Sequence, residues 1–248
     1  MTAGEIATVR AAELLRVTGL VQGVGFRPFV HRVATRYGLG GWVRNGAGEV
    51  SIAAEGTPEA LEAFVGALER EAPPLTRIAR IAREPCAPEG RTDFAILLSA
   101  VEPDGRLPVS PDVAWCAACE HELLEPGDRR FRYPFITCTD CGPRFSVIEA
   151  MPYDRERTSM RAFAMCPECR REYETPGNRR HHSQTNSCPA CGPRLWLEHA
   201  DGRVLERHRA RAIEAAAAML REGLIVAVRG LGGFHLAVDA TDEAAVRR

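Results

Sequence analysis

The chain has 248 residues, of which 45% are hydrophobic, and 32 basic against 33 acidic side chains leave a formal net charge of −1. This length accommodates two or three compact units, and no apolar run reaches the length that crosses a membrane. Every one of the basic residues is an arginine. This excludes lysine-nucleophile and Schiff-base chemistry and leaves arginine and backbone N–H groups for anion binding.

Residues 1–12 carry no clear pattern, and we expect them to form a flexible tail. Because they contain no apolar segment, they argue against secretion and for a cytoplasmic protein. A first strand is expected over residues 15–20. The glycine-rich segment 21–28 follows, and apolar residues then recur at helical spacing up to Tyr37, with Pro28 in the first turn of that helix.

A second set of strands and a helix comes next. Residues 42–45 indicate a short strand and residues 46–48 a hairpin turn, and alternating apolar side chains at 50–54 predict the next strand. Thr57 is a suitable N-cap with Pro58 at the first helical position. We therefore expect a second helix with one apolar face to follow.

The end of this region holds two candidate strands. Ile78 and Ile81 are three residues apart, a spacing that fits a helix as well as a strand. Apolar residues alternate from Phe94 to Leu98 and predict a final strand. Residues 13–100 thus predict an α+β, acylphosphatase-like domain with the ferredoxin-like βαββαβ order, in which two helices cover a four-stranded antiparallel sheet.

Eight of the nine cysteines fall into four CxxC pairs, which are Cys116/Cys119, Cys138/Cys141, Cys166/Cys169 and Cys188/Cys191. Shifting the first two pairs by fifty positions lands on the last two. The run Cys-Gly-Pro-Arg at 141–144 returns at 191–194 in the same register. This region is therefore a tandem duplication of one small unit.

A CxxC turn directs two thiolates at one centre, and a second CxxC about twenty residues on closes a tetrahedral four-cysteine site that suits Zn²⁺. We assign one structural zinc to each repeat, while a cross-braced pairing of the same cysteines stays open. Disulfides are disfavoured in a cytoplasmic protein, and a redox CxxC usually occurs singly. Because each repeat is too short for its own core, zinc should supply about 10 kcal/mol of folding free energy per site. Cys86 is left unpaired.

The remaining segments complete the expected layout. Residues 101–111 are rich in Pro, Gly and Asp and indicate a linker, and residues 112–198 form a small tandem zinc-finger domain. Residues 205–248 predict an alanine-rich helix and then a buried strand over 224–228. The chain stops at Arg248 inside what reads as another helix, so we expect this α/β unit to be truncated.

The segment between the first strand and the first helix is a candidate phosphate-binding loop. Its glycines let consecutive N–H groups point at one anion, and the helix adds the positive end of its dipole. Arg27 can add a guanidinium, and Asn45 can hold a water molecule. These parts suit phosphoryl transfer to water, and an ordinary glycine turn beside a surface arginine is the alternative. The loop residues are Gln22, Gly23, Val24, Gly25 and Phe26.

These residues carry a resemblance to a known family. The run from Gly19 to Arg27, together with Gly41-x-Val43-x-Asn45, is similar to the acylphosphatase signature. In that family the loop amides and the arginine bind phosphate and the asparagine orients the attacking water. By resemblance these roles pass to Arg27 and Asn45.

One family is more similar still. The run Gly-Phe-Arg-Pro-Phe-Val at 25–30, followed by the duplicated CxxC array, resembles the HypF-type carbamoyltransferases that mature NiFe hydrogenases. Further matching runs lie at 112–116, 129–135, 152–160 and 229–236. Residues 181–184 read His-His-Ser-Gln where Phe-His-Ala-Gln is usual, so no role is assigned to that loop. Arg229 stands where lysine is usual.

The resemblance implies a division of labour. An acylphosphatase-like domain would hydrolyse carbamoyl phosphate to carbamate and phosphate. A YrdC-like domain, of which residues 205–248 would be the start, would join carbamate to ATP as carbamoyl adenylate, and Arg229, Gly232 and Gly233 would belong to its nucleotide site. A further domain would pass the carbamoyl group to the C-terminal cysteine of the partner HypE. ATP and Mg²⁺ would act only in the full-length protein, so full transferase activity is not expected of this fragment.

Two rival functions are less well supported. A zinc module that binds nucleic acid should be basic, but between Asp112 and Glu198 twelve arginines face thirteen acidic residues, and zinc-bound thiolates add negative charge. No nucleic-acid or membrane partner is therefore expected. A free-standing acylphosphatase would have no use for the cysteine array.

Overall fold

The computed structural model describes residues 10–46, 48–100, 111–230 and 232–248. Most of the predicted tail and linker, at 1–9 and 101–110, lies outside the described residues, as do Ala47 of the predicted turn and Leu231, which precedes Gly232. By its internal contacts the chain forms two compact units, Met1–Cys116 with Thr137–Asn186 and Ala117–Ile136 with Ser187–Arg248.

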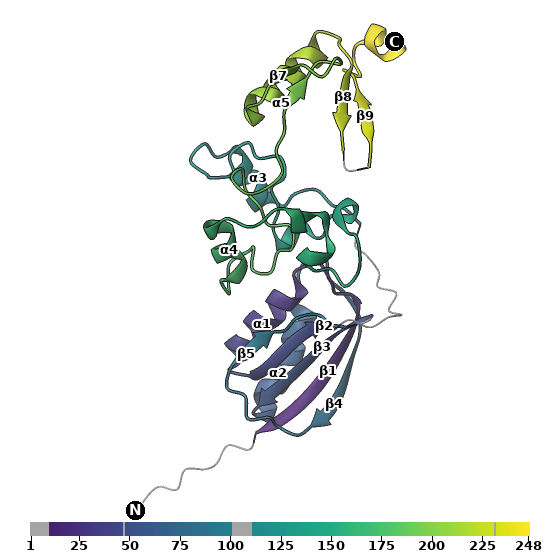
Figure 1. The fold of residues 1–248 in the computed structure, drawn as a ribbon. Coiled ribbons are helices and arrows are strands. Elements are labelled where there is room, and N and C mark those ends of the chain that lie inside the picture. Colours follow the sequence, from purple (N-terminus) through teal and green to yellow (C-terminus); the bar gives the residue numbers. More distant parts are fainter. Residues whose placement is uncertain (1–9, 47, 101–110, 231) are drawn as a thin grey trace, which may run out of the picture. The chain divides into compact units, whose positions relative to one another are not determined.

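The first unit contains a five-stranded sheet with the strand order β4-β1-β3-β2-β5 (Figure 1). Neighbouring strands are antiparallel, except that β5 runs parallel to β2. The expected four-stranded antiparallel sheet was therefore one strand short, because both candidate last strands form. The strands are β1 (Ala11–Leu20), β2 (Gly40–Asn45), β3 (Glu49–Gly56), β4 (Arg77–Cys86) and β5 (Phe94–Ile96).

A bulge in β4 explains the isoleucine spacing that fitted either a helix or a strand. The ladder between β1 and β4 shifts register at Gly19, which leaves Ala79 as an extra residue. Ile78 and Ile81 therefore both pack against the core although they are three residues apart. Gly19 has a φ of +120°, and a Cβ at this position would clash with the carbonyl of Arg77.

Helices α1 (Phe26–Arg36) and α2 (Pro58–Arg70) lie behind the sheet in Figure 1 and cover its core. The predicted N-cap of α2 is confirmed, because the Thr57 hydroxyl accepts a hydrogen bond from the Ala60 N–H at 3.2 Å. The buried apolar residues of this core run from Leu15 in β1 to Phe94 in β5.

The predicted last strand is shorter than expected. β5 ends at Ile96, and Leu98 is 92% exposed rather than inward-facing. Past β5 the backbone still follows β2, since the N–H of Ala100 donates to the carbonyl of Asn45 at 2.8 Å. This path carries Ser99 to the end of β2.

The two cysteine repeats fold alike. Helix α3 (Ala117–Leu124) of the first repeat recurs as α4 (Pro167–Glu174) fifty positions later. Arg132 and His182 are also equivalent, and both have positive φ, at 52° and 54°. The duplication read from the sequence is thus repeated in the backbone. Short 3₁₀ turns lie at Thr139–Cys141, Phe145–Val147, Arg155–Arg157 and Ser159–Ala162.

Equivalent arginines bind the opposite repeat. Nε of Arg130, from the first repeat, donates to the carbonyl of Ser187 in the second repeat at 3.0 Å. Nε of Arg180, from the second repeat, donates to the carbonyl of Thr137 in the first at 3.0 Å. The two arginines are only 2% and 3% exposed. This exchange is one reason why each compact unit contains parts of both repeats.

The elements after the fingers are small. Among the described residues, β6 pairs only with β7 and β8 only with β9. The predicted buried strand at 224–228 begins only at Val226, and Leu224 and Ile225 are 46% and 44% exposed. The expectation of burial was wrong because β8 lies in a two-stranded hairpin rather than in a larger sheet. The elements are β6 (Leu197–Glu198), β7 (Val204–Glu206), α5 (Arg209–Arg221), β8 (Val226–Arg229), β9 (Phe234–Ala237) and α6 (Glu243–Arg247).

None of the helices in the described part of the chain has the length and the apolar character needed to cross a membrane.

Candidate functional site

The loop between β1 and α1 leaves its backbone amides available. Gly23 and Gly25 have φ values of +73° and +77°, a region that glycine enters without steric cost, and Gly25 is the N-cap of α1. Within the described residues, no backbone carbonyl accepts a hydrogen bond from the N–H groups of residues 22–26. Consecutive free amides at a helix N-terminus are suited to bind an anion.

The same glycines are needed for space. A Cβ at Gly23 would lie 3.1 Å from side-chain atoms of Pro143 and Tyr153, and a Cβ at Gly25 would lie 3.0 Å from Thr139. These neighbours come from the cysteine-rich region. The loop therefore packs closely against residues 137–186 of the same unit.

Gln22 fastens the loop to the hairpin formed by β2 and β3. Its Nε2 donates to the carbonyl oxygens of Gly46 and Glu49 at 3.1 and 3.2 Å, and the residue is 5% exposed. Asn45 ends β2, beside the same hairpin. In the sheet, β3 lies between β1 and the strand β2 that carries Asn45.

Arg27 lies in the first turn of α1 and is 8% exposed. With its amide oxygen turned toward the guanidinium, Asn45 accepts from Nε at 3.2 Å and from Nη2 at 3.3 Å. Nη1 donates to Ser99 Oγ at 3.2 Å, and Nη2 donates to Asp154 Oδ1 at 3.0 Å. The two predicted catalytic residues therefore meet, and Ser99 and Asp154 join them.

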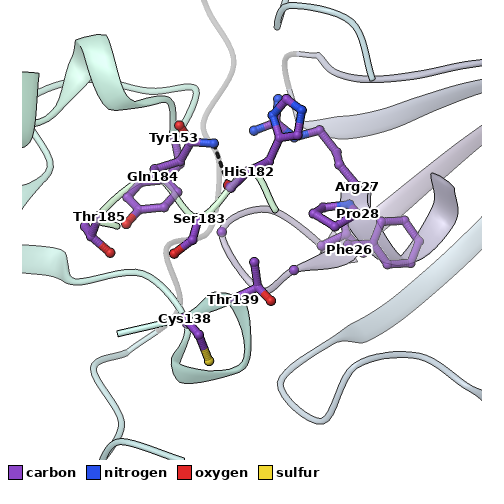
Figure 2. A pocket seen from close by; sticks show the side chains of 14 residues that line it. Phe26, Arg27, Pro28, Cys138, Thr139, Tyr153, His182, Ser183, Gln184 and Thr185 are labelled. Atoms are coloured by element: carbon purple, nitrogen blue, oxygen red, sulfur yellow. Dashed lines mark hydrogen bonds between the residues drawn. The ribbon is translucent and has the colours of Figure 1, made fainter. Parts of the chain in front are cut away.

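A pocket opens between the loop and the cysteine-rich segment of the first unit (Figure 2). In this view Arg27 and Pro28 lie to one side, Tyr153 and Thr185 to the other, and His182 between them. Backbone amides and a guanidinium thus face side chains that carry hydroxyl and imidazole groups.

The imidazole at this pocket is uncharged near neutral pH. Burial lowers the pKa of His182 to about 3, and the positive charge of Arg27 adds to this effect. Burial also lowers the pKa of His181 to about 4, with a further contribution from His31. His182 therefore contributes a neutral polar group to the pocket, and Arg27 remains the cation there.

The cysteines gather in two sets of four, each belonging to one repeat. The thiol sulfurs of each set lie within 4.8 Å of one another. Individual Sγ separations are 3.6 Å for Cys116 and Cys138, 3.8 Å for Cys138 and Cys141, and 3.7 Å for Cys188 and Cys191. Four sulfurs around a tetrahedral zinc at about 2.3 Å would be about 3.8 Å apart. Both sets therefore fit zinc, in the pairing predicted within each repeat.

The first set also has hydrogen-bond donors that favour thiolates. The Cys116 N–H donates to Cys141 Sγ at 3.3 Å, and Arg179 Nη1 lies 3.8 Å from Cys116 Sγ. Donors and a positive charge around a sulfur stabilise its ionised form, which is the form that binds metal.

The predicted nucleotide residues lie together in the hairpin formed by β8 and β9. The Gly230 N–H donates to the carbonyl of Gly233 at 2.7 Å. The guanidinium of Arg229 lies 5.8 Å from the centroid of the Phe234 ring. Gly232 belongs to the same turn, and the nucleotide role of these residues stays a prediction.

Sequence reasoning missed three residues at the site. Asp154 belongs to one of the runs that resembled the family, but no role was assigned to it. His182 lies in the loop whose match was imperfect. Ser99 follows the last strand without any motif. The run 152–160 contains two acidic residues, Asp154 and Glu156, and nothing in the sequence singled out Asp154 as the partner of Arg27 or pointed to Ser99.

Comparison with known proteins supports two family assignments for parts of the chain. The profile of the Acylphosphatase family matches residues 14–96, and that of the HypF finger matches residues 115–148 and 165–198. An acylphosphatase of Thermococcus kodakarensis is 43% identical over 84 residues, which cover 34% of this chain and 91% of that protein.

Longer relatives match almost the whole chain. Carbamoyltransferase HypF2 of Cupriavidus necator is 51% identical over 236 residues, which cover 94% of this chain and 29% of that protein. Carbamoyltransferase HypF of Synechocystis is 49% identical, with 94% and 30% covered. The crystal structure of a full-length HypF in the phosphate- and nucleotide-bound form has a TM-score of 0.84 and 42% identity, and covers 96% of this chain and 31% of that one.

The chain thus spans about a third of the length of these relatives. Along this chain the acylphosphatase match precedes the two finger matches. The resemblance found in the sequence is confirmed: the chain corresponds to the N-terminal region of the HypF carbamoyltransferases, and its residues 14–96 belong to the acylphosphatase family.

Proposed function

We propose that the site at Arg27 and Asn45 hydrolyses carbamoyl phosphate to carbamate and inorganic phosphate. One observation carries this proposal. The free amides of residues 22–26, the buried guanidinium of Arg27 and the amide of Asn45 lie together at one site. The phosphate found in the related full-length HypF structure and the membership in a carbamoyltransferase family both support this substrate.

In this proposal the loop amides and Arg27 bind the phosphoryl oxygens, whose negative charge grows in the transition state. Asn45 has its amide oxygen toward Arg27, so its N–H₂ group is left to hold the attacking water. The water oxygen forms a bond to phosphorus while the bond from phosphorus to the carbamoyl oxygen breaks. The bonding electrons leave with carbamate, and the water proton passes to solvent or to phosphate.

We further propose that each four-cysteine set binds one structural Zn²⁺, two per chain. The sulfur spacing and the finger family support this metal. Four thiolates leave no open coordination position, so zinc would hold the fold rather than take part in hydrolysis.

The wider role is also proposed. In longer relatives the carbamate would be joined to ATP, with Mg²⁺, by a YrdC-like domain to which residues 205–248 and the site at Arg229 would contribute. The product would be transferred to a HypE-type partner. The domain boundaries at 13–100, 101–111 and 112–198 and a cytoplasmic location, which suits thiolate metal sites, belong to the same proposal.

The test is release of phosphate from carbamoyl phosphate by this chain in the absence of ATP. Arg27→Ala should lower kcat/KM at least 1000-fold, because the guanidinium contributes charge stabilisation to the transition state. Asn45→Ala should lower kcat by about 10- to 100-fold with little change in KM. An Arg27→Ala protein that keeps its turnover would refute the assignment.

The control is Arg44→Ala, which removes an exposed arginine next to Asn45 that stacks on Trp42, with its guanidinium 4.8 Å from the ring centroid. Its kcat/KM should stay within about twofold of the unmodified protein. The second candidate function is that of a free-standing acylphosphatase. Equal kcat/KM for carbamoyl phosphate and for a bulky acyl phosphate such as benzoyl phosphate would favour it.

A further inference from the structure

Arg27 has one ionised partner within the described residues, the carboxylate of Asp154. Nη2 of Arg27 and Oδ1 of Asp154 are 3.0 Å apart, and the two side chains are 9% and 21% exposed. The residues are 127 positions apart in the sequence. The carboxylate therefore reaches the phosphate site from the cysteine-rich region of the same compact unit.

The backbone holds Asp154 firmly. Tyr153 before it is 4% exposed and Arg155 after it is 9% exposed. The Arg155 N–H donates to Gln184 Oε1 at 2.9 Å, and its guanidinium donates to the carbonyl of Phe163 at 2.7 Å. A residue between two such anchored neighbours has little freedom to move.

The side chain of Asp154 is not used locally. Asp154 is the N-cap of the 3₁₀ turn Arg155–Arg157, a position at which aspartate usually accepts a backbone N–H. Here it makes no such capping bond, and Oδ1 accepts from Arg27 instead. The carboxylate is thus directed at the guanidinium at the expense of its ordinary local contact.

We propose that Asp154 is a positioning residue for phosphoryl transfer: it holds the Arg27 guanidinium in the orientation that meets the phosphoryl group. This inference rests on the proposed function of Arg27. It also makes the cysteine-rich segment 137–186 part of the hydrolytic site rather than a separate module.

The number of N–H donors on Arg27 indicates that Asp154 positions the guanidinium rather than blocking the binding of phosphate to it. A guanidinium has five N–H donors. Asn45 takes those of Nε and Nη2, Asp154 takes the other on Nη2, and Ser99 takes one on Nη1. The second N–H of Nη1 remains for phosphate, and the neutral Ser99 hydroxyl can yield its place. Asp154 therefore fixes the guanidinium without occupying every donor that an anion would use.

The expected effects follow from loss of that hold. In Asp154→Ala the long Arg27 side chain regains rotamer freedom, so kcat should fall by about 10- to 100-fold while KM changes less than about threefold. Asp154→Asn keeps an oxygen acceptor at the same place and should retain at least a third of kcat. Asp154→Glu keeps the charge but displaces it by one methylene, and its kcat should lie between those of Asp154→Ala and Asp154→Asn.

The experiment measures phosphate release from carbamoyl phosphate and inhibition by inorganic phosphate for the whole chain. Glu156→Gln is the matched control, because it removes an exposed carboxylate two residues away on the same turn, and its kcat and KM should be unchanged. Zinc content and the melting temperature of each variant show whether the fold is kept. If Asp154→Ala does not fold, the kcat values of Asp154→Asn and Asp154→Glu are compared instead, and Asp154→Glu should have the lower one.

Two results would overturn the inference. If Asp154→Ala and Asp154→Asn both lower KM and the inhibition constant of phosphate while kcat is kept, the carboxylate competes with phosphate rather than positioning Arg27. If neither variant alters kcat, the contact is structural. Loss of hydrolysis in Arg27→Ala distinguishes both results from failure of the proposed function, in which that variant would remain active.

Discussion

At the scale of single residues, burial sets the charge of the groups around the pocket. His181 is buried and His182 is half-buried, both beside positive or potentially positive neighbours, and their pKa values fall to about 4 and about 3. An unfolded histidine has a pKa of about 6.5. Between these values the unfolded chain binds protons that the folded chain does not, so stability is lost as the pH falls below about 6.5.

This difference predicts a pH dependence of the free energy of unfolding that substitution of one histidine should reduce. For each histidine the free energy of unfolding should decrease by up to about 1.4 kcal/mol per pH unit between pH 6 and pH 4. His182→Asn should flatten the slope, because asparagine does not titrate and tolerates the positive φ of this position. Urea unfolding at pH 7, 6 and 5 provides the measurement.

Zinc release at low pH would lower the free energy of unfolding of both the unmodified protein and His182→Asn. The difference between their slopes against pH therefore reports the contribution of the His182 imidazole. His208→Asn is the control, since His208 is exposed and lies outside the pocket. Equal slopes for the unmodified protein and His182→Asn would contradict the assigned burial effect.

At the scale of elements, the repeats stabilise one another through exchanged arginines. Arg130 and Arg180 are equivalent by duplication, and each donates to a carbonyl of the other repeat. The contacts of Ser187 with Arg130 and of Thr137 with Arg180 are both 3.0 Å long. Paired arginines that could have suggested a nucleic-acid surface are in this case internal braces.

Loss of either brace should destabilise the finger region by similar amounts. Arg180→Met keeps the apolar stem but leaves the buried Thr137 carbonyl without this donor, which should cost about 1–3 kcal/mol. Arg130→Met should have an effect of the same size on the Ser187 side. Denaturant unfolding of the zinc-loaded protein measures both.

Arg170→Met serves as the reference substitution, because the Arg170 side chain is 60% exposed and pairs only with Glu174 among the described ion pairs. It should change stability by less than about 0.5 kcal/mol. A loss for Arg180→Met no larger than this would show that the cross-repeat contact is not a brace.

At the scale of the whole molecule, two kinds of stabilisation operate in one chain. The sheet and its two helices bury a continuous apolar core that runs from Leu15 to Phe94. The cysteine region has short helices and 3₁₀ turns with few buried apolar side chains, and its two four-cysteine sets would be held by metal. The sheet should therefore be independent of zinc, whereas the fingers should not.

Zinc removal tests this contrast. Elemental analysis should give two Zn²⁺ per chain, and a chelator should release both with loss of structure in residues 116–198, detected by hydrogen exchange. Amides of β1 and β3 should stay protected, since their core contains no cysteine-region residue. Hydrolysis of carbamoyl phosphate should decline, because Asp154 would lose its contact with Arg27 and His182 would leave the pocket.

Unchanged exchange in residues 116–198 after complete zinc loss would contradict a structural role for the metal. The matched substitution Cys86→Ser should leave the zinc content at two, because Cys86 is exposed and belongs to neither four-cysteine set.

The sequence by itself determined whatever depends on neighbouring residues or on exact repetition. The cap at Thr57, the glycine loop before Arg27 and the four CxxC pairs repeated at a spacing of fifty residues are of this kind. Such features are readable because their geometry is set within a few residues or is copied twice. The two predicted catalytic residues were found in the same way, through a local motif in each strand region.

Only the tertiary structure decided which distant segments meet. It added a fifth strand, since Ile78 and Ile81 fit either a helix or a strand until the bulge opposite Gly19 is seen. It left Leu98 exposed, because β5 stops at Ile96. It brought Asp154 to Arg27 across 127 positions. Pairing of this kind depends on the packing of the whole unit, and no local pattern in the chain encodes it.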